Sequence, residues 1–216
     1  MKISKRLISL ASLVDKNDYI ADIGCDHALL DIYLVLNNIV NKVLISDINQ
    51  NALNSGIQNI HKYHLEDKII AKLGNGLETI TPDINTLIIS GMGTSTIIKI
   101  LESPKIKQIN KLIIESNNDY YLLRNYICHH GFYISHESVI YDKGKYYINI
   151  VFLRGTKKYS FKELMYGPLL MQGNKEYFEY LYQKNNKILK NIPIFNLKER
   201  LKIKKANILL KKFKNK

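Results

Sequence analysis

Residues 19–27, YIADIGCDH, have the pattern of a buried β-strand that passes through a glycine turn into a helix. Apolar and β-branched residues fill the first part, and Gly24 stands where the chain must turn. In an open sheet of parallel strands, the first turn of this kind lies at the carboxyl edge, where α/β proteins bind their ligands. The segment therefore predicts the first strand of an α/β domain and part of its binding site.

Short β-branched runs continue to alternate with longer amphipathic stretches up to residue 130, which indicates strands joined by crossover helices. We expect a first helix at 3–14, strands at 19–23, 43–46, 69–73, 86–90 and 111–115, and helices at 26–37, 49–64, 94–103 and 119–130. Two further runs, 132–140 and 145–153, are so close together that they must form an antiparallel hairpin. The predicted fold is α/β with a Rossmann-like mixed sheet of seven strands, typical of class I methyltransferases.

The end of the chain differs from the rest in charge. Residues 1–150 carry 15 basic and 15 acidic side chains, whereas the remaining 66 residues carry 17 basic and 4 acidic ones, so the net charge of +13 lies there. A segment of one sign attracts polyanions, of which nucleic acid is the commonest and membrane lipid the alternative. A general richness in lysine is a third explanation, but it would act on the first 150 residues too. We therefore favour a functional basic segment.

Helical patterns fill this basic segment. A short helix ends near Gly167-Pro168, and helices at 174–190 and 196–214 flank Pro193, which breaks the chain. We expect these two helices to form a coiled-coil-like hairpin. The side chains expected to face one another are Phe178, Leu181, Asn185, Ile188, Leu197, Leu201 and Ile208. The predicted domains are an α/β domain at 1–158 and a basic helical extension at 159–216.

The composition excludes several other classes of protein. A chain of 216 residues with 46% hydrophobic and 24% charged residues is typical of a globular protein, not of a collagen-like or disordered one. No stretch is apolar and long enough to cross a bilayer, and the N-terminal apolar run lacks a leader cleavage site, so we expect a cytoplasmic protein. Cys25 and Cys128 lie far apart, and the six histidines lack carboxylate or thiol neighbours at ligand spacing. Neither a disulfide nor a metal site is predicted.

Acidic residues follow the first two predicted strands. The dinucleotide fingerprint needs three glycines, but here only Gly24 is present and Asp26 stands where the second glycine would be. A carboxylate there repels a diphosphate and suits a cationic ligand such as S-adenosylmethionine; alternatively, Asp26 caps the next helix. Asp47 lies 23 residues after Gly24, near the spacing of an acid that binds ribose hydroxyls. Asp47 could also cap the helix that starts near Asn49.

Glycine turns follow the third and fourth predicted strands. The sequence GNG at 74–76 lets the backbone approach an adenine ring, and Asn75 can bond to its edge. The sequence SGMG at 90–93 lies where reacting groups meet in α/β enzymes, although from spacing alone a plain tight turn explains it better. The tetrapeptide of many exocyclic-amine methyltransferases, Asp or Asn followed by two prolines and an aromatic residue, does not occur here. This argues against chemistry on an amino group.

Together these segments resemble the bacterial tRNA adenine-N1 methyltransferases that modify adenine 22 of tRNA. The resemblance rests on ISKRL at 3–7, ADIGCDHA at 21–28, GNGL at 74–77, GMG at 91–93, KGKYY at 143–147 and YGPLL at 166–170. Three places depart from the family pattern. Cys25 replaces a serine, Thr94 replaces a glycine, and Glu115-Ser116 replaces a Gln-Pro pair before Asn117.

The resemblance implies S-adenosylmethionine as the cofactor, tRNA as the partner, and N1 of adenine 22 as the methyl acceptor. We expect no membrane or metal partner and a monomer. The expected cofactor-binding residues are Gly24, Asp26, His27, Asp47, Ile48, Gly74, Asn75, Gly76, Ser90, Gly91 and Met92. The expected catalytic residues are Asp26 and Asn117, and the expected RNA-binding residues are Lys5, Arg6, Lys184, Lys187 and Lys190. The alternatives are a noncatalytic RNA-binding protein with this fold and a small-molecule methyltransferase.

Overall fold

The structure is a computed structural model that describes residues 1–215. It divides into two compact units, Met1–Ser160 and a second unit that begins at Phe161. Among the described residues, no helix combines the length and the apolar character needed to cross a membrane.

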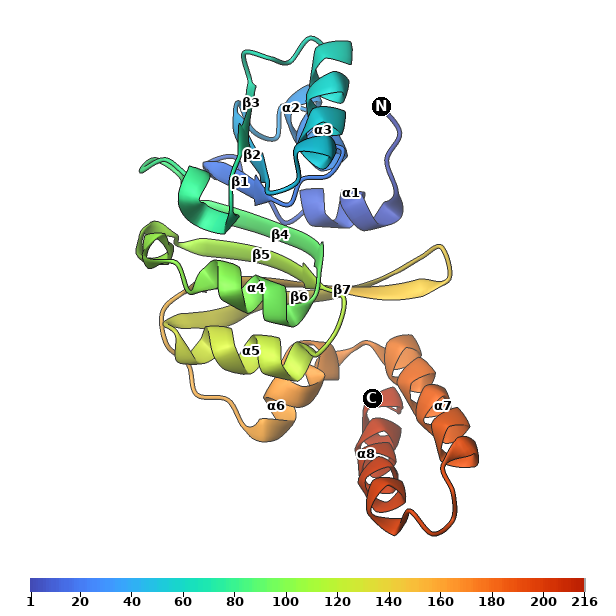
Figure 1. Ribbon diagram of the computed structural model, residues 1–216. Helices are drawn as coiled ribbons and strands as arrows, with labels where there is room; N and C mark the ends of the chain where they lie inside the picture. The colour runs from blue at the N-terminus through green and yellow to red at the C-terminus, as the bar shows by residue number, and fades with distance from the viewer. Residues whose placement is uncertain (216) are drawn as a thin grey trace. The chain divides into compact units, whose positions relative to one another are not determined.

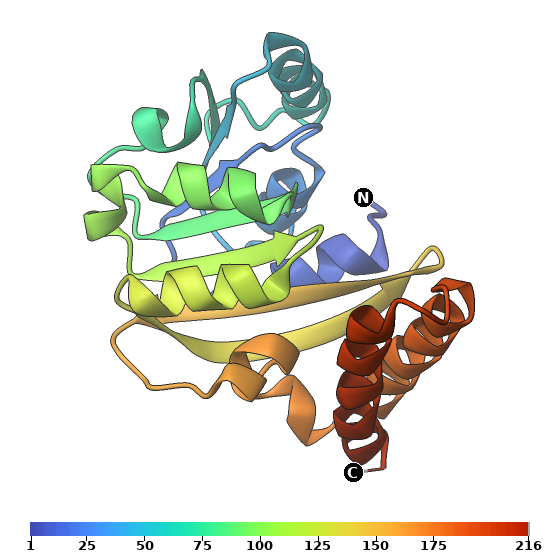
Figure 2. The same ribbon diagram turned by 60° about the horizontal axis from the view of Figure 1, so that its bottom comes forward.

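A seven-stranded sheet forms the centre of the first unit (Figures 1 and 2). The strands lie in the order β3-β2-β1-β4-β5-β7-β6; β1 to β5 are parallel, and β7 is antiparallel to both its neighbours. Their bounds are β1 Ile20–Ile23, β2 Val43–Asp47, β3 Ile69–Leu73, β4 Thr86–Met92, β5 Lys111–Ser116, β6 Phe132–Asp142 and β7 Lys145–Arg154. The predicted mixed, Rossmann-like sheet is confirmed, and β3 has the predicted bounds.

Helices cover both faces of this sheet (Figures 1 and 2). On one face lie α1 (Lys5–Ala11), α2 (Leu29–Leu36) and α3 (Gln50–Lys62), and on the other lie α4 (Thr94–Leu101) and α5 (Tyr120–His129). Short 3-10 helices, η1 (Gly76–Thr79) and η2 (Pro104–Gln108), lie in the connections. Helix α2 begins three residues later than predicted because Asp26 and Ala28 have φ values of 46° and 53°, which a right-handed helix cannot include.

The position of the binding crevice follows from the strand order. Strand β1 pairs with β2 on one side and with β4 on the other, so successive connections leave the sheet in opposite directions at this point. Loops therefore separate above the carboxyl ends of β1 and β4 and leave a crevice. All four residues of β1 are buried, as expected for a strand covered on both faces.

The β6–β7 hairpin reaches beyond the rest of the sheet. Ile114 of β5 pairs with Ile150 of β7, and since the two strands are antiparallel and β5 ends at Ser116, residues before 148 continue past the carboxyl end of β5. Figure 2 shows this yellow hairpin extending beyond the ends of β4 and β5. Along the outermost strand β6, a bulge lies between Ile134 and His136, and the Tyr159 hydroxyl accepts a hydrogen bond of 2.9 Å from the N–H of Ile134.

The second unit is helical, with α6 (Phe161–Tyr166), η3 (Leu170–Gln172), α7 (Lys175–Asn191) and α8 (Leu197–Lys214). Helices α7 and α8 form the predicted hairpin, with the rings of Phe178 and Phe213 buried 5.0 Å apart. The Nδ2 atom of Asn185 donates a hydrogen bond of 2.9 Å to Asn207 across the interface. This pair and the aromatic rings determine which faces of α7 and α8 pack together.

The prediction that Leu197, Leu201 and Ile208 of α8 face α7 is wrong. Leu197, Leu201 and Ile208 are 65%, 55% and 59% exposed. The buried stripe of α8 lies on another face, which is formed by Asn207, Leu210 and Phe213. Because Asn207 is polar, apolar periodicity alone does not indicate that this face of α8 is buried.

Candidate active site

Two adjoining cavities open at the carboxyl edge of the sheet, one of about 440 Å³ and the other of about 570 Å³. Gly24, Asp47 and Met92 line both cavities, so the two form one continuous cleft at the switch point of the sheet. The first cavity is lined mainly by polar and charged side chains. Apolar surface predominates in the second, although the 74–76 turn and polar side chains such as Glu78 and Lys99 also line it, and Ile48, 70% exposed, lies at its edge. A cleft of this size and division suits a ligand with one charged end and one flat apolar end.

Asp22 lines the first cavity, where it forms a buried carboxyl pair with Asp31 of α2. The two residues are 4% and 0% exposed, and among the described residues nothing hydrogen-bonds to Oδ1 of Asp22 or to either oxygen of Asp31. Burial raises the pKa of Asp22 to about 7, although a protonated Asp31 beside it, as a potential hydrogen-bond donor, and the positive charge of Arg6 oppose the rise. Burial and the neighbouring Asp22 raise the pKa of Asp31. A buried acceptor beside a cavity is satisfied when a ligand brings a donor, and a cationic donor suits it best.

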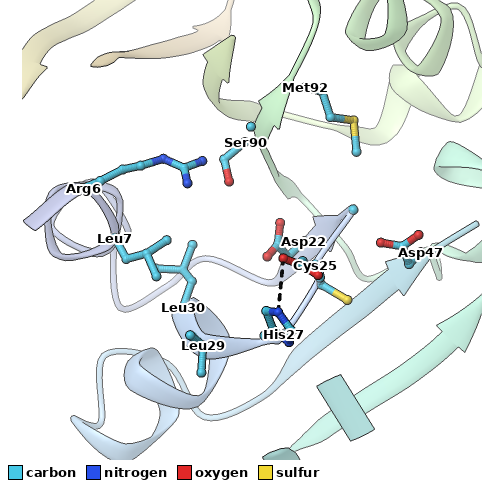
Figure 3. A pocket seen from close by; sticks show the side chains of 13 residues that line it. Arg6, Leu7, Asp22, Cys25, His27, Leu29, Leu30, Asp47, Ser90 and Met92 are labelled. Carbon is cyan, nitrogen blue, oxygen red and sulfur yellow. Dashed lines mark ion pairs between the residues drawn. The ribbon is translucent and has the colours of Figure 1, made fainter. Parts of the chain in front are cut away.

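Arg6 of α1 and Glu115 of β5 form an ion pair at another wall of the first cavity. The Nε atom of Arg6 donates to both carboxylate oxygens of Glu115 at 2.8 Å, and the Glu115 side chain is completely buried. Burial raises the pKa of Glu115, although Arg6 opposes this. Figure 3 shows the Arg6 side chain extending toward Ser90, with Asp22, Cys25 and His27 across the cavity. The pair fixes α1 against the sheet and gives this wall a rigid shape.

Asp26 and Asp47 place two more carboxyl groups around the cleft. The side chain of Asp26 is 72% exposed, and its Oδ2 lies 3.7 Å from Nε2 of His27. Helix capping explains neither residue, because α2 has Ala28 at its N-cap and α3 is capped by the Asn49 side chain. Asp47 instead accepts a hydrogen bond of 2.8 Å from the N–H of Asn49, which fixes the orientation of its carboxylate.

The 90–93 segment is the bulged end of β4, not a plain tight turn. Gly91 has a φ of 77°, and the pairing with β5 shifts between Ser90 and Met92. The N–H of Asn117 donates a hydrogen bond of 2.8 Å to the carbonyl oxygen of Met92, and the Asn117 side chain donates to the carbonyl oxygen of Gly91. Asn117 therefore supports the backbone that lines the first cavity.

Two departures from the family pattern contact each other behind this bulge. The hydroxyls of Thr94 and Ser116 lie 2.8 Å apart, and both residues are almost fully buried. The Thr94 hydroxyl also donates to the carbonyl oxygen of Asn118 at 2.7 Å. The changes at 94 and 116 thus form one local hydrogen-bonded unit.

The thiol of Cys25 is buried at the first cavity. Burial, followed by repulsion from Asp22 and Asp31, raises the pKa of this thiol, so it stays protonated at neutral pH. A protonated, buried thiol is a poor nucleophile. The site therefore offers charge and shape without a covalent nucleophile at this position.

Comparison with known proteins identifies the family. Residues 3–150 match the family model described as a methyltransferase domain. The tRNA (adenine(22)-N(1))-methyltransferase of Bacillus subtilis (strain 168) is 31% identical over 160 residues, which cover 73% of this chain and 67% of that protein. The chain belongs to the S-adenosylmethionine-dependent tRNA adenine-N1 methyltransferase family.

Solved structures of similar proteins agree with this family. M. capricolum TrmK in complex with S-adenosyl-homocysteine is 32% identical, has a TM-score of 0.83, and covers 100% of this chain and 99% of its own. Streptococcus pneumoniae Sp1610 is 30% identical with a TM-score of 0.91 and covers 99% of this chain and 100% of its own. The similarity to both structures therefore spans the second unit as well as the sheet domain.

In this chain, every residue predicted to bind the cofactor lines one of the two cavities. Asn117 lines neither of them but holds the Gly91-Met92 backbone, which does. Lys5 is exposed on α1, Arg6 is held by Glu115, and the three predicted lysines of the second unit are exposed along α7. No role was predicted for three further residues of this region, Asp22, Asp31 and Glu115. For Asp22, its position as an acidic residue inside an otherwise apolar strand could have indicated a functional role.

Proposed function

We propose that this chain transfers the methyl group of S-adenosylmethionine to N1 of adenine 22 in tRNA. The observation that carries this proposal is the carboxyl-lined cleft, with a buried and unpartnered oxygen of Asp22, in a chain of this family. A cleft without pyrophosphate-binding glycines and with several acidic groups favours a cationic ligand over a dinucleotide. We also propose that the protein is cytoplasmic and monomeric.

The residues of the cleft fit the parts of this cofactor. Asp22 would accept hydrogen bonds from the ammonium group of its methionine end, which satisfies the buried oxygen. Asp47 would hold the ribose hydroxyls, and Asn75 and Ile48 would hold the adenine in the second cavity. When bound, the cofactor supplies an electrophilic methyl group on a positively charged sulfur. Its charge is matched by the carboxyl groups of the cleft.

The protein's contribution to catalysis would be alignment and electrostatics. Adenine N1 is itself the nucleophile, and correct alignment of two reacting centres can lower a barrier by roughly 7–11 kcal/mol in ideal cases. The adenine ring would gain positive charge as N1 bonds to the methyl carbon while the carbon–sulfur bond breaks to leave neutral S-adenosyl-homocysteine, and the exposed carboxylate of Asp26 would stabilise the charge on the ring. Asn117 would act by holding the Gly91-Met92 backbone in place.

The basic second unit would hold the RNA backbone. Of the final 66 residues 17 are basic, and the three lysines predicted to bind RNA are exposed on α7. Phosphate contacts of this kind give affinity and orientation, while the base is recognised elsewhere. In folded tRNA the target adenine is stacked or paired, so the enzyme would have to extract it into the cleft.

The decisive experiment is labelled methyl transfer into unmodified tRNA, followed by nucleoside analysis. The proposal predicts 1-methyladenosine in tRNA with adenine at position 22 and no product in the matched tRNA with guanine at that position. Product on the guanine-22 tRNA would contradict the position, and product only on small molecules would contradict the tRNA substrate.

A salt titration tests the role of α7. Replacement of Lys184, Lys187 and Lys190 by glutamine should reduce the slope of log Kd against log salt by about 2–3, because each lost phosphate contact removes roughly 0.7–0.9. The control replaces three exposed lysines of the first unit, Lys42, Lys62 and Lys68. An unchanged slope in the α7 variant would show that this helix does not bind the backbone.

A further inference from the structure

The tip of the β6–β7 hairpin overhangs the edge of the sheet that carries the cleft. Because Ile114 pairs with Ile150, Ser116 at the end of β5 is level with Ile148, and residues 145–147 lie beyond it. At about 3.3 Å per residue this overhang is roughly 10 Å long. The tip is therefore built from residues that add nothing to the pairing of the central sheet.

Exposed aromatic and basic side chains occupy this tip. Tyr141 pairs across the hairpin with Tyr146, their ring centroids are 4.8 Å apart, and Tyr141 is 58% exposed. Lys143 and Lys145 are exposed beside them. The turn itself requires only the positive φ values of Lys143 and Gly144, 47° and 83°. The turn geometry thus explains residues 143 and 144 but not an exposed tyrosine next to them.

A continuous set of contacts joins this tip to the wall of the cleft. The ring of Tyr147 contacts both Nζ of Lys145, 4.9 Å from its centroid, and the guanidinium of Arg6, 5.2 Å from it. The N–H of Arg6 also donates a hydrogen bond of 3.2 Å to Asp142. Because the Arg6 side chain lines the first cavity, the tip is fixed relative to the site of methyl transfer.

From this arrangement we propose that the hairpin tip is an RNA-binding element in which Tyr141 stacks on an unpaired base near the target adenine, while Lys143 and Lys145 contact phosphates. This inference rests on the proposed function and adds the location of a base contact to it. Aromatic faces flanked by lysines are the usual means of holding unpaired nucleotides. A protein partner is less consistent with the tip because its apolar area is confined to one tyrosine pair between charged residues.

The test measures the Kd for unmodified tRNA and for S-adenosylmethionine in four variants. Tyr141→Ala removes the ring, Tyr141→Leu keeps an apolar side chain without a π face, and Tyr141→Phe keeps the ring without the hydroxyl. The matched control is Tyr19→Ala, because Tyr19 is 59% exposed but precedes β1 at the opposite edge of the sheet. Thermal unfolding verifies that each variant is folded.

The proposal predicts that Tyr141→Ala and Tyr141→Leu raise the Kd for tRNA by about tenfold, within the range for loss of one stacked base. Tyr141→Phe and Tyr19→Ala should bind tRNA like the wild type, and all four should bind S-adenosylmethionine equally well. The salt dependence should be unchanged in Tyr141→Ala and reduced when Lys143 and Lys145 become glutamine.

Several outcomes would overturn the inference. Wild-type affinity of Tyr141→Ala for tRNA would do so, and so would an equal loss in Tyr141→Phe, because a hydroxyl contact would then replace stacking. A parallel loss of cofactor affinity would show that the tip only supports the cleft. If the wild-type protein binds and methylates tRNA but Tyr141→Ala matches it, this inference alone fails. If the wild-type protein does neither, the proposed function fails as well.

Discussion

Replacement of Asp22 by asparagine should change how the stability of the cofactor-free protein depends on pH. Asp22 is 4% exposed and its surroundings include Asp31, Asp47 and Arg6. Burial raises its pKa from an ordinary value of 3.8 to about 7, so between these values the folded protein holds a proton that the unfolded chain has released. The stability that Asp22 contributes is therefore present at low pH and is lost as pH rises toward 7. Asparagine has the same shape and does not titrate.

The size of the effect follows from the same shift. Each pH unit in this window costs the wild type about 1.4 kcal/mol relative to a non-titrating side chain. From pH 5 to pH 8, the free energy of unfolding of the wild type should therefore fall by about 3 kcal/mol relative to that of Asp22→Asn, as an upper estimate. The control is Asp67→Asn, which removes an exposed carboxylate, and its free energy of unfolding should change little relative to that of the wild type over this pH range.

Urea unfolding at a series of pH values, without cofactor, measures this difference directly. A difference between Asp22→Asn and wild type that stays constant within about 0.5 kcal/mol would refute the reasoning. It would mean that the Asp22 carboxyl group titrates alike in the folded and unfolded protein and is not desolvated. In a separate measurement, calorimetry should find that Asp22→Asn binds S-adenosylmethionine more weakly than the wild type, because the acceptor for the ammonium group has lost its charge.

Two further predictions concern Gly24 and the buried pair of Arg124 and Glu137. Gly24→Ala should lower the free energy of unfolding by about 1–2 kcal/mol, because φ is 81° at this position. It should also weaken cofactor binding in calorimetry, because the new Cβ would overlap the side chain of Met92, which lines both cavities. Glu137→Gln should cost about 3–5 kcal/mol in urea unfolding, because Nε of Arg124 lies 2.7 Å from Glu137 and both side chains are almost fully buried. Glu102→Gln, at an exposed position, should change stability by less than about 0.5 kcal/mol.

The parts of the fold that sequence predicted are those set by local patterns. The β-branched runs gave all seven strands, and glycine turns after the first, third and fourth strands indicated the edge that carries the cleft. Predicted helix ends were less accurate, because the positive φ values of Asp26 and Ala28 delay α2 and are not evident from residue type.

The parts that sequence did not predict depend on contacts between distant residues. Arg6 and Glu115 are 109 positions apart, and nothing near either residue indicates that α1 packs against the end of β5. The pairing of Asp22 with Asp31 likewise depends on how α2 lies on the sheet. In the second unit, the face of α8 that is buried depends on a hydrogen bond between Asn185 and Asn207.

The phenol of Tyr159 has a consequence for solubility. Strand β6 is eleven residues long and lies at the open side of the sheet, where unpaired amide groups can recruit a strand from another molecule. The Tyr159 hydroxyl occupies the Ile134 amide, and the neighbouring bulge twists the strand away from a straight template. One aromatic residue just before the helical unit thus helps to keep concentrated protein from aggregating edge to edge.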